Sequence, residues 1–312
     1  MPARSTVVAS GEQIELRHSD QRVVVVEVGG GLRTYSIADR ELLDGYAEDQ
    51  MCPSARGEAL IPWPNRLRDG SYEFGSDRLQ LALTEPGKHN AIHGLTRWAN
   101  WTPTERAENH VTMEHVLHPQ DGYPFALALR IDYRLEANGL AVETTATNVG
   151  AVECPYGAGA HPYLTAGTDV IDGCTLKSPG AVRMLTDDQA IPTGSERVDG
   201  TEFDFRAPKR IGSTQLDTGY SELDRDPDGR ARVVLQASDG DASVTLWMDE
   251  RYPYLMLFTG DSLPDHARRR RGLGVEPMTC APNAFQSGEG LQRLQPDESF
   301  TSAWGIGPHK AA

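Results

Sequence analysis

Hydrophobic and polar residues alternate over short stretches of the chain, and this pattern predicts β-strands. In its clearest instance, residues 127–135, Leu, Leu, Ile, Tyr and Leu alternate with Ala, Arg, Asp and Arg. A period of two places the apolar side chains on a buried face and the polar ones in solvent. Ala137-Asn138-Gly139 follows, and Asn-Gly readily adopts the positive φ angles of a tight turn. We therefore expect a hairpin whose second strand runs over residues 140–147.

Other stretches predict strands of the same kind. Residues 22–28 form a β-branched run before a triple glycine, and residues 231–235 lead through Asp239-Gly240 to residues 243–248, as in a second hairpin. The short apolar segment 254–258 suits a fully buried strand. Long amphipathic helical patterns are missing, so the chain is predicted to be all-β, a large and mainly antiparallel β-sandwich. No shift in composition marks a linker, which favours a single domain over residues 1–312.

Composition narrows the range of partners. The 312 residues carry 45 acidic and 30 basic side chains, a net charge of −15, which argues against binding to nucleic acid or an anionic membrane. No apolar stretch approaches the roughly 18 residues of a membrane-spanning helix, and residues 7–9 are too short for a secretory signal. The four cysteines are widely spaced, as expected of reduced thiols. We expect a cytoplasmic protein, monomer or homodimer, that binds a neutral or weakly charged small molecule.

The common catalytic signatures are missing from the sequence. It contains no GxSxG, no GxxxxGK[ST] and no HExxH, and the triple glycine 29–31 does not begin a GxGxxG motif. His110, His115 and His118 lie close together, but on a strand His115 points away from the other two, so a shared metal would need a bend. We therefore expect no metal site there. The run Arg268–Arg271 is expected to be a solvated loop.

What remains is a set of polar clusters embedded in Gly, Pro and aromatic residues. They are IPWPNRLRDG at 61–70, NAIHG at 90–94, GAHPY at 159–163, LDTGY at 216–220 and GVEPMTCAPNAF at 274–285. Taken singly, each also fits a structural role, such as a turn, a strand end or a histidine bonded to the backbone. Proline fixes φ, however, and rigid placement of acids and bases is what catalysis requires. The clusters together therefore indicate a catalytic site.

The ordered set of clusters resembles the motifs of the aldose 1-epimerases, also called galactose mutarotases. The resemblance rests on Pro64-Asn65-Arg66, Asn90-Ala91-Ile92-His93-Gly94, His161-Pro162-Tyr163, Leu216-Asp217, Val275-Glu276-Pro277, Pro282-Asn283-Ala284-Phe285 and the closing Trp304-Gly305-Ile306. It implies a β-sandwich with a sugar cleft. It also implies that the protein interconverts the α and β anomers of a free monosaccharide without metal or organic cofactor.

The resemblance also implies roles for individual residues. Glu276 would be the base that takes the proton of the C1 hydroxyl, and His161 the acid that protonates the ring oxygen. The sugar-binding residues would be His93, Arg66, Asp217, Asn65, Tyr163 and Trp63. For Trp63, Tyr163 and Phe285 a place in the core fits equally well. The chemistry agrees with these roles, because opening a cyclic hemiacetal removes a proton from one oxygen and adds one to another.

Two departures from the galactose enzymes leave the preferred aldose open. Leu95 follows His93-Gly94 where that branch often has a second glycine, and Thr218-Gly219 follows Asp217 where a more polar pair is common. Two alternatives also stay open. One is an epimerase of a phosphorylated hexose, with a phosphate pocket built from Arg68, Arg97 or the Arg268 run. The other is a non-catalytic carbohydrate-binding or regulatory protein of the same fold.

Overall fold

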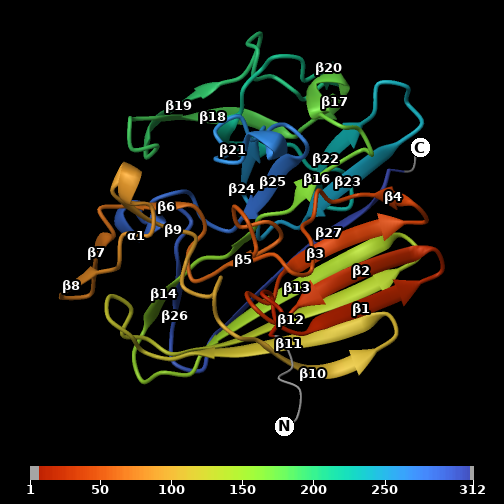
Figure 1. The fold of residues 1–312 in the computed structure, drawn as a ribbon. Coiled ribbons are helices and arrows are strands. Elements are labelled where there is room, and N and C mark those ends of the chain that lie inside the picture. Colours follow the sequence, from red (N-terminus) through yellow and green to blue (C-terminus); the bar gives the residue numbers. More distant parts are fainter. Residues whose placement is uncertain (1–6, 310–312) are drawn as a thin grey trace.

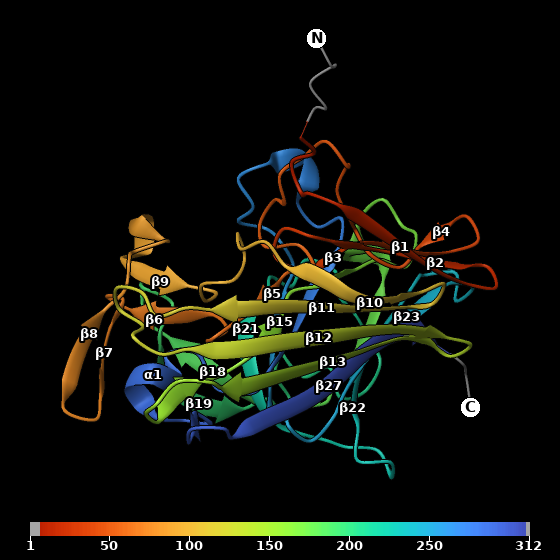
Figure 2. The ribbon, with the colours of Figure 1, turned by 90° about the horizontal axis from the view of Figure 1, so that it is seen from below.

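Two large antiparallel sheets make up most of the protein, which is described here from a computed structural model over residues 7–309. Residues 1–6, which precede the short apolar patch considered above, lie outside this range. Nine strands form the larger sheet, in the order β10 (Thr102–Ala107), β11 (His110–Leu117), β12 (Leu127–Glu136), β13 (Gly139–Asn148), β27 (Ser299–Pro308), β23 (Ser243–Met248), β22 (Ala231–Gln236), β17 (Thr175–Lys177) and β20 (Lys209–Arg210). Figure 2 shows β10 to β13 and β27 of this sheet side by side.

The second large sheet carries the strands that matter for function. Its order is β19 (Pro192–Arg197), β18 (Gly180–Thr186), β21 (Asp217–Leu223), β24 (Tyr254–Phe258), β25 (Leu273–Met278), β15 (Gly159–Ala160) and β5 (Ala59–Leu60), and β16 (Tyr163–Leu164) also pairs with β25. Figure 1 shows β21, β24 and β25 above strands β10 to β13 of the nine-stranded sheet.

Smaller elements surround these sheets. A four-stranded sheet consists of β1 (Gln13–His18), β2 (Gln21–Val26), β3 (Leu32–Ile37) and β4 (Arg40–Glu41). Three two-stranded ribbons pair β6 (Arg66–Arg68) with β9 (Asn90–Ile92), β7 (Ser71–Phe74) with β8 (Asp77–Gln80), and β14 (Cys154–Tyr156) with β26 (Gln292–Leu294). The helical elements of the described chain are α1 (Ala284–Ser287) and the 3-10 turns η1 (Pro86–Lys88), η2 (Ile171–Gly173) and η3 (His266–Arg268).

The all-β prediction is confirmed, and the predicted hairpins are present. β12 pairs with β13 from Leu127↔Asn148 to Glu136↔Gly139, and the side chains of β12 alternate between buried and exposed along most of its length. The segments 243–248 and 254–258 are strands with the predicted bounds. Alternation located β12 because that strand has one face in the core and one outside it, whereas β24 was located by its short apolar run.

The core lies between the two large sheets. Leu129 and Ile131 of β12 belong to the same buried cluster as Leu257 of β24 and Val275 of β25. Since successive side chains of a strand point to opposite faces, Val275 faces this core and its neighbour Glu276 faces the other side. The functional site described below lies on that other side, where the eight-stranded sheet meets the segments that carry β6, β9 and η1.

Two expectations about polar and thiol groups can be compared with the structure. All four cysteines are buried and free of disulfides. The prediction of a solvated loop at Arg268–Arg271 is wrong for three of its arginines: Arg268 pairs with Asp44, Arg269 donates to the Leu263 carbonyl, and Arg270 bridges two acids, Asp172 and Asp261. The run ties several loops together because acids and carbonyls distant in sequence converge on it. Within residues 7–309, no helix is both long and apolar enough to cross a membrane.

Candidate active site

The strand register brings His161 and Glu276 together although 115 positions separate them. In the pairing with β25, Gly159 is opposite Met278 and Tyr163 is opposite Gly274, so residue 161 falls opposite residue 276. His161 Nε2 lies 3.3 Å from Glu276 Oε1, and both side chains are almost fully buried. A Cβ on Gly274 would lie at an ordinary contact distance of 3.6 Å from His161 Cε1 but only 3.2 Å from Phe258 Cβ, so glycine here eases the packing against β24. An acid and a base thus share one contact.

Burial sets the protonation of this pair. It raises the pKa of the Glu276 carboxyl to about 8, and the neighbouring Asp217 carboxylate adds to the rise. It lowers the pKa of the His161 imidazole to about 3, and the charges of Arg56 and Arg97 add to the fall. A low dielectric disfavours both charged forms. At neutral pH the unliganded pair therefore holds one proton, on the carboxyl, and the imidazole is neutral.

His93 faces the same pair from a strained loop position. Its ring lies edge-on to that of His161, with 5.3 Å between the centroids. Both His93 and Asn65 have positive φ angles, of 64° and 56°, which non-glycine residues seldom adopt. Two hydrogen bonds join them: the backbone amide of His93 donates to the backbone carbonyl of Asn65, and the backbone amide of Asn65 donates to His93 Nδ1. Because a backbone N–H can only donate, Nδ1 of His93 is unprotonated and Nε2 carries the proton.

The loop that carries His93 requires glycine at position 94. Gly94 has a φ of +72°, and a Cβ on it would lie 2.0 Å from the Ile61 carbonyl oxygen. The Leu95 amide donates to that same carbonyl at 2.7 Å. A side chain at residue 94 would therefore push the His93 loop away from the IPWPN segment.

A stack of rings holds His161 in place. Tyr163 lies parallel to the imidazole with 4.9 Å between centroids and an interplanar angle of 13°, and the Arg56 guanidinium lies 4.1 Å from the centre of the Tyr163 ring. The backbone is fixed too, since the His161 amide donates to Glu58 O and its carbonyl accepts from the Gly57 amide. Tyr163, expected to contact sugar, therefore also supports the imidazole.

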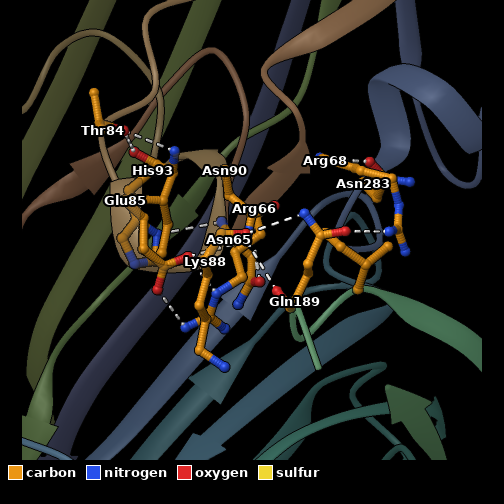
Figure 3. A network of polar contacts seen from close by, with 12 residues as sticks. Asn65, Arg66, Arg68, Thr84, Glu85, Lys88, Asn90, His93, Gln189 and Asn283 are labelled. Atoms are coloured by element: carbon orange, nitrogen blue, oxygen red, sulfur yellow. Dashed lines mark hydrogen bonds and ion pairs between the residues drawn. The ribbon is translucent and has the colours of Figure 1, made fainter. Parts of the chain in front are cut away.

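Arg66 forms an ion pair with the carboxylate of Glu85 at the site. Its Nε and Nη2 atoms donate to the two oxygens of Glu85 at 2.8 and 2.9 Å, a bidentate pair. Asn90 Nδ2 donates to Glu85 Oε2 at 3.1 Å, and these contacts hold the pKa of the half-buried Glu85 carboxyl below its ordinary value although burial opposes them. Figure 3 shows this network. Arg66 is thereby fixed in orientation and largely neutralised.

The turn between β18 and β19 is hydrogen-bonded to this network. Asn90 Nδ2 also donates to the Gln189 carbonyl at 2.9 Å, and Gln189 Nε2 donates to the Lys88 carbonyl at 3.2 Å (Figure 3). Arg68 donates to the Gln189 side chain and to Asp187. Asn90 is fully buried, so its two amide protons link the turn at residue 189 to Glu85 and, through it, to Arg66.

These side chains surround a cavity of about 270 Å³. This is just below the roughly 300–1,000 Å³ typical of ligand pockets, which suits a ligand of monosaccharide size. Seven of the predicted site residues line it together: Asn65, Arg66, His93, His161, Tyr163, Asp217 and Glu276. Trp63 is not among the lining residues, and this is a correction. Its indole is 3% exposed and packs on Phe285 at 5.5 Å, within the core.

The cavity also has walls that motif reasoning missed. Glu85, Arg97, Met256, Phe258, Ser262 and Leu263 are among its lining residues. The only sequence signal for Met256 and Phe258 was their place in a predicted strand. Glu85 had none, because the arginine that it binds lies 19 residues earlier, beyond an intervening ribbon. Arg97 was considered only as one of several arginines for a phosphate.

Three side chains of the site are of types that bind metal ions. His93, His161 and Glu276 each offer an atom within 4.8 Å of the others, as two histidines and a glutamate do in zinc enzymes. A histidine that binds metal usually donates its other ring N–H to an acceptor. His93 does the opposite, since its Nδ1 accepts from the Asn65 amide, and its Nε2–H is a hydrogen-bond donor toward the cavity. His110 and His115, expected to bind no metal, contact Asp132 and the Asn100 carbonyl.

The arrangement of strands is that of the galactose mutarotase-like proteins. The GalM/aldose epimerase homologue from C. elegans superposes with a TM-score of 0.84 at 17% identity, over 96% of this chain and 99% of that one. Galactose 1-epimerase from Lactobacillus acidophilus NCFM superposes with a TM-score of 0.77 at 21% identity, over 95% and 94%. At these identities the likeness shows the fold, a mutarotase-like β-sandwich.

Sequence comparison then identifies the family. Residues 12–306 match the model of the aldose 1-epimerase family. The uncharacterized protein YihR of Escherichia coli (strain K12) is 33% identical over 300 residues, which cover 95% of this chain and 94% of that protein. The chain belongs to the aldose 1-epimerase family, as its motifs indicated. Membership supports a sugar epimerase or mutarotase, an enzyme of the isomerase type.

Proposed function

We propose that the protein interconverts the α and β anomers of an aldose by opening and closing the sugar ring, with Glu276 as base and His161 as acid. One observation carries the proposal. A carboxyl and an imidazole lie 3.3 Å apart, buried, in a cavity of monosaccharide size. Glu276 Oε2 and His161 Nδ1 are buried without a hydrogen-bond partner in residues 7–309, so the pair has capacity left for a ligand.

The reaction needs a single proton on this pair. With a cyclic sugar bound, the Glu276 carboxylate takes the O1 proton while the His161 imidazolium protonates the ring oxygen. The C1–O5 bond breaks and the C1 carbonyl forms. Rotation about C1–C2 presents the other face, and the same transfers in reverse close the ring. Moving both protons together avoids a charged intermediate, and each partner contributes typically about 10²–10⁴-fold.

Burial places the resting pair in the state that follows ring opening. The unliganded site favours a protonated Glu276 and a neutral His161, the pattern that accompanies the open-chain aldehyde. A bound cyclic sugar must therefore use its own hydrogen bonds to favour the ionised pair, a Glu276 carboxylate and a His161 imidazolium. His93 Nε2–H, the Arg66–Glu85 pair and Asp217 are the polar groups placed to make them.

Polarimetry of freshly dissolved α-glucose and α-galactose tests the proposal. The wild type should shorten the approach to equilibrium relative to buffer. Glu276→Gln and His161→Asn should each lower kcat by at least about 10²-fold, because neither amide moves a proton. Glu143→Gln and His118→Asn, changes at exposed positions, are the matched controls and should keep wild-type rates.

Three results would overturn these assignments. If no aldose is accelerated, the protein is a non-catalytic carbohydrate binder of the same fold. If Glu276→Gln keeps wild-type turnover, Glu276 is not the base. A His161→Asn variant that raises only KM would make His161 a binding residue and leave His93 as the acid.

A further inference from the structure

Arg97 is a cation at the cavity that no carboxylate holds closely. It lies in the segment between β9 and β10 and lines the same cavity as His93 and His161, with its side chain 15% exposed. Its nearest acid is Glu58, whose Oε2 lies 3.7 Å from Nη1, too far for a hydrogen bond. Among residues 7–309 no side-chain hydrogen bond of Arg97 is formed, whereas Arg66 is bound by Glu85 through two. The donors of the Arg97 guanidinium are therefore available to a ligand.

Glu58 offsets this charge only in part. Its carboxyl is 3% exposed, and neither oxygen has a hydrogen-bond partner in the described chain. Burial raises the pKa of Glu58 to about 7. A substantial fraction of the molecules therefore carries a neutral Glu58 at neutral pH, and Arg97 keeps net positive charge at the wall of the cavity.

The backbone that carries Arg97 is held in place by the triple glycine that follows β2. Gly29 has a φ of +80°, and a Cβ on it would lie 2.8 Å from the Arg97 carbonyl oxygen. The Gly29 amide donates to the Ala99 carbonyl at 2.9 Å. The glycines, which fit no nucleotide-binding motif, therefore allow the Arg97 segment to pack closely against the end of β2.

Arg97 stands on the histidine side of the site. Arg97 follows His93 by four residues on the same segment, and Glu58, whose carboxyl oxygen lies 3.7 Å from the Arg97 guanidinium, accepts the His161 amide through its backbone carbonyl. In the proposed reaction Glu276 faces O1 and His161 faces the ring oxygen. The next ring atom beyond that oxygen is C5, which bears C6, so a substituent on C6 of a sugar bound in this way would extend toward the histidine side of the cavity, where Arg97 lies.

We propose that Arg97 binds an acidic group on C6, so that hexoses with a phosphate or carboxylate at this position are the preferred substrates; this inference rests on the proposed function. Both groups offer oxygens that accept from the planar guanidinium fork. Of the other arginines considered for a phosphate, Arg271 does not line this cavity, and the rest are already engaged. Arg68 binds Gln189 and Asp187, and Arg268 binds Asp44 and the Gly45 carbonyl.

Anomer exchange measured by NMR on three sugars tests this inference. Glucose, glucose 6-phosphate and glucuronate differ in the group at C6, and each rate is compared with the same sugar in buffer. The wild type should show a kcat/KM at least about tenfold higher for one or both acidic sugars than for glucose, as a charge-assisted contact provides. The two acidic arms show whether phosphate or carboxylate is bound.

Variants of Arg97 assign the preference to this residue. Arg97→Gln should bring the ratio of acidic to neutral kcat/KM to about one, and Arg97→Lys should keep part of it, since the charge stays and the fork is lost. Arg106→Gln, which removes a surface arginine paired with Glu12, is the control and should keep the wild-type ratio. If Arg97→Gln does not fold because Glu58 is left unpaired, the double variant Glu58→Gln, Arg97→Gln removes both charges and answers the same question.

The outcomes separate this inference from the proposed function. Acceleration of glucose with no gain for either acidic sugar overturns the role of Arg97 and leaves the mutarotase proposal standing. A preference for acidic sugars that survives Arg97→Gln also overturns it. Failure to accelerate any of the sugars overturns the proposed function and this inference together.

Discussion

Replacing Glu276 by glutamine should make the protein more stable while it removes activity. The reason is the raised pKa of this buried carboxyl, about 8 against 4.5 for the ordinary group. At pH 7 ionisation of Glu276 lowers the free energy of the unfolded chain, whereas the folded chain keeps this carboxyl protonated. A group with a raised folded pKa contributes stability below pH 4.5 and loses it progressively as the pH rises to about 8. Glutamine does not titrate and escapes this loss.

The magnitude follows from the interval between the ordinary pKa and the working pH. From 4.5 to pH 7 is 2.5 units, and each unit corresponds to about 1.4 kcal/mol, so the variant gains about 3 kcal/mol at pH 7. At pH 5 the interval is 0.5 units and the gain falls below about 1 kcal/mol. With an unfolding entropy of roughly 2.1 cal/mol/K per residue, about 3 kcal/mol raises Tm by roughly 5 °C in a chain of this size.

Differential scanning calorimetry at pH 5 and pH 7 measures this effect. Glu143→Gln, an exposed substitution on β13, serves as the control and should show no difference that depends on pH. A Tm gain for Glu276→Gln of the same size at both pH values, or no gain at pH 7, would refute the argument. The proton of the resting pair would then not reside on the carboxyl.

Two further predictions concern the pair and its surroundings. The active pair holds one proton. It loses this proton above the pKa of Glu276 near 8 and gains a second one below the pKa of His161 near 3. The value of kcat/KM, corrected for the buffer reaction, should therefore be flat from about pH 4 to 7 and fall about tenfold per unit above 8. An alkaline limb that remains in Glu276→Gln would contradict this. Asn90→Asp places a second carboxylate beside Glu85 and should raise KM about tenfold in steady-state assays, whereas Gln189→Ala, which keeps the carbonyl that Asn90 contacts, should change KM less than about threefold. Equal effects of the two variants would show that Asn90 does not position Arg66.

Much of the fold could be predicted because its strands have one core face and one open face. The hairpin of β12 and β13 follows from alternation and an Asn-Gly turn alone. Short buried strands such as β15 and β16 carry no such alternation, yet their pairing with β25 places His161 opposite Glu276. Strand order in the sheets is a property of pairings between distant segments, and local periodicity contains no record of it.

The site was predicted in its polar residues and less well in their partners. Motif residues such as Asn65 and His93 do converge on one cavity. The binding of Arg66 by Glu85 was missed because nothing in the local pattern distinguishes Glu85 from a surface acid. Trp63 was wrongly predicted to contact the sugar for a related reason. An aromatic residue beside a catalytic motif is equally suited to the core, and Trp63 packs there against Phe285.

The stack of Arg56, Tyr163 and His161 has a consequence for how the two anomers are handled. An imidazole that stacks on a parallel ring, with its backbone amide and carbonyl both hydrogen-bonded, is restrained to this position. In the proposed reaction the protein therefore stays still and the aldehyde turns. Both anomers are produced by one immobile set of atoms, and stereochemical inversion is left entirely to a half-turn of the substrate's own C1–C2 bond.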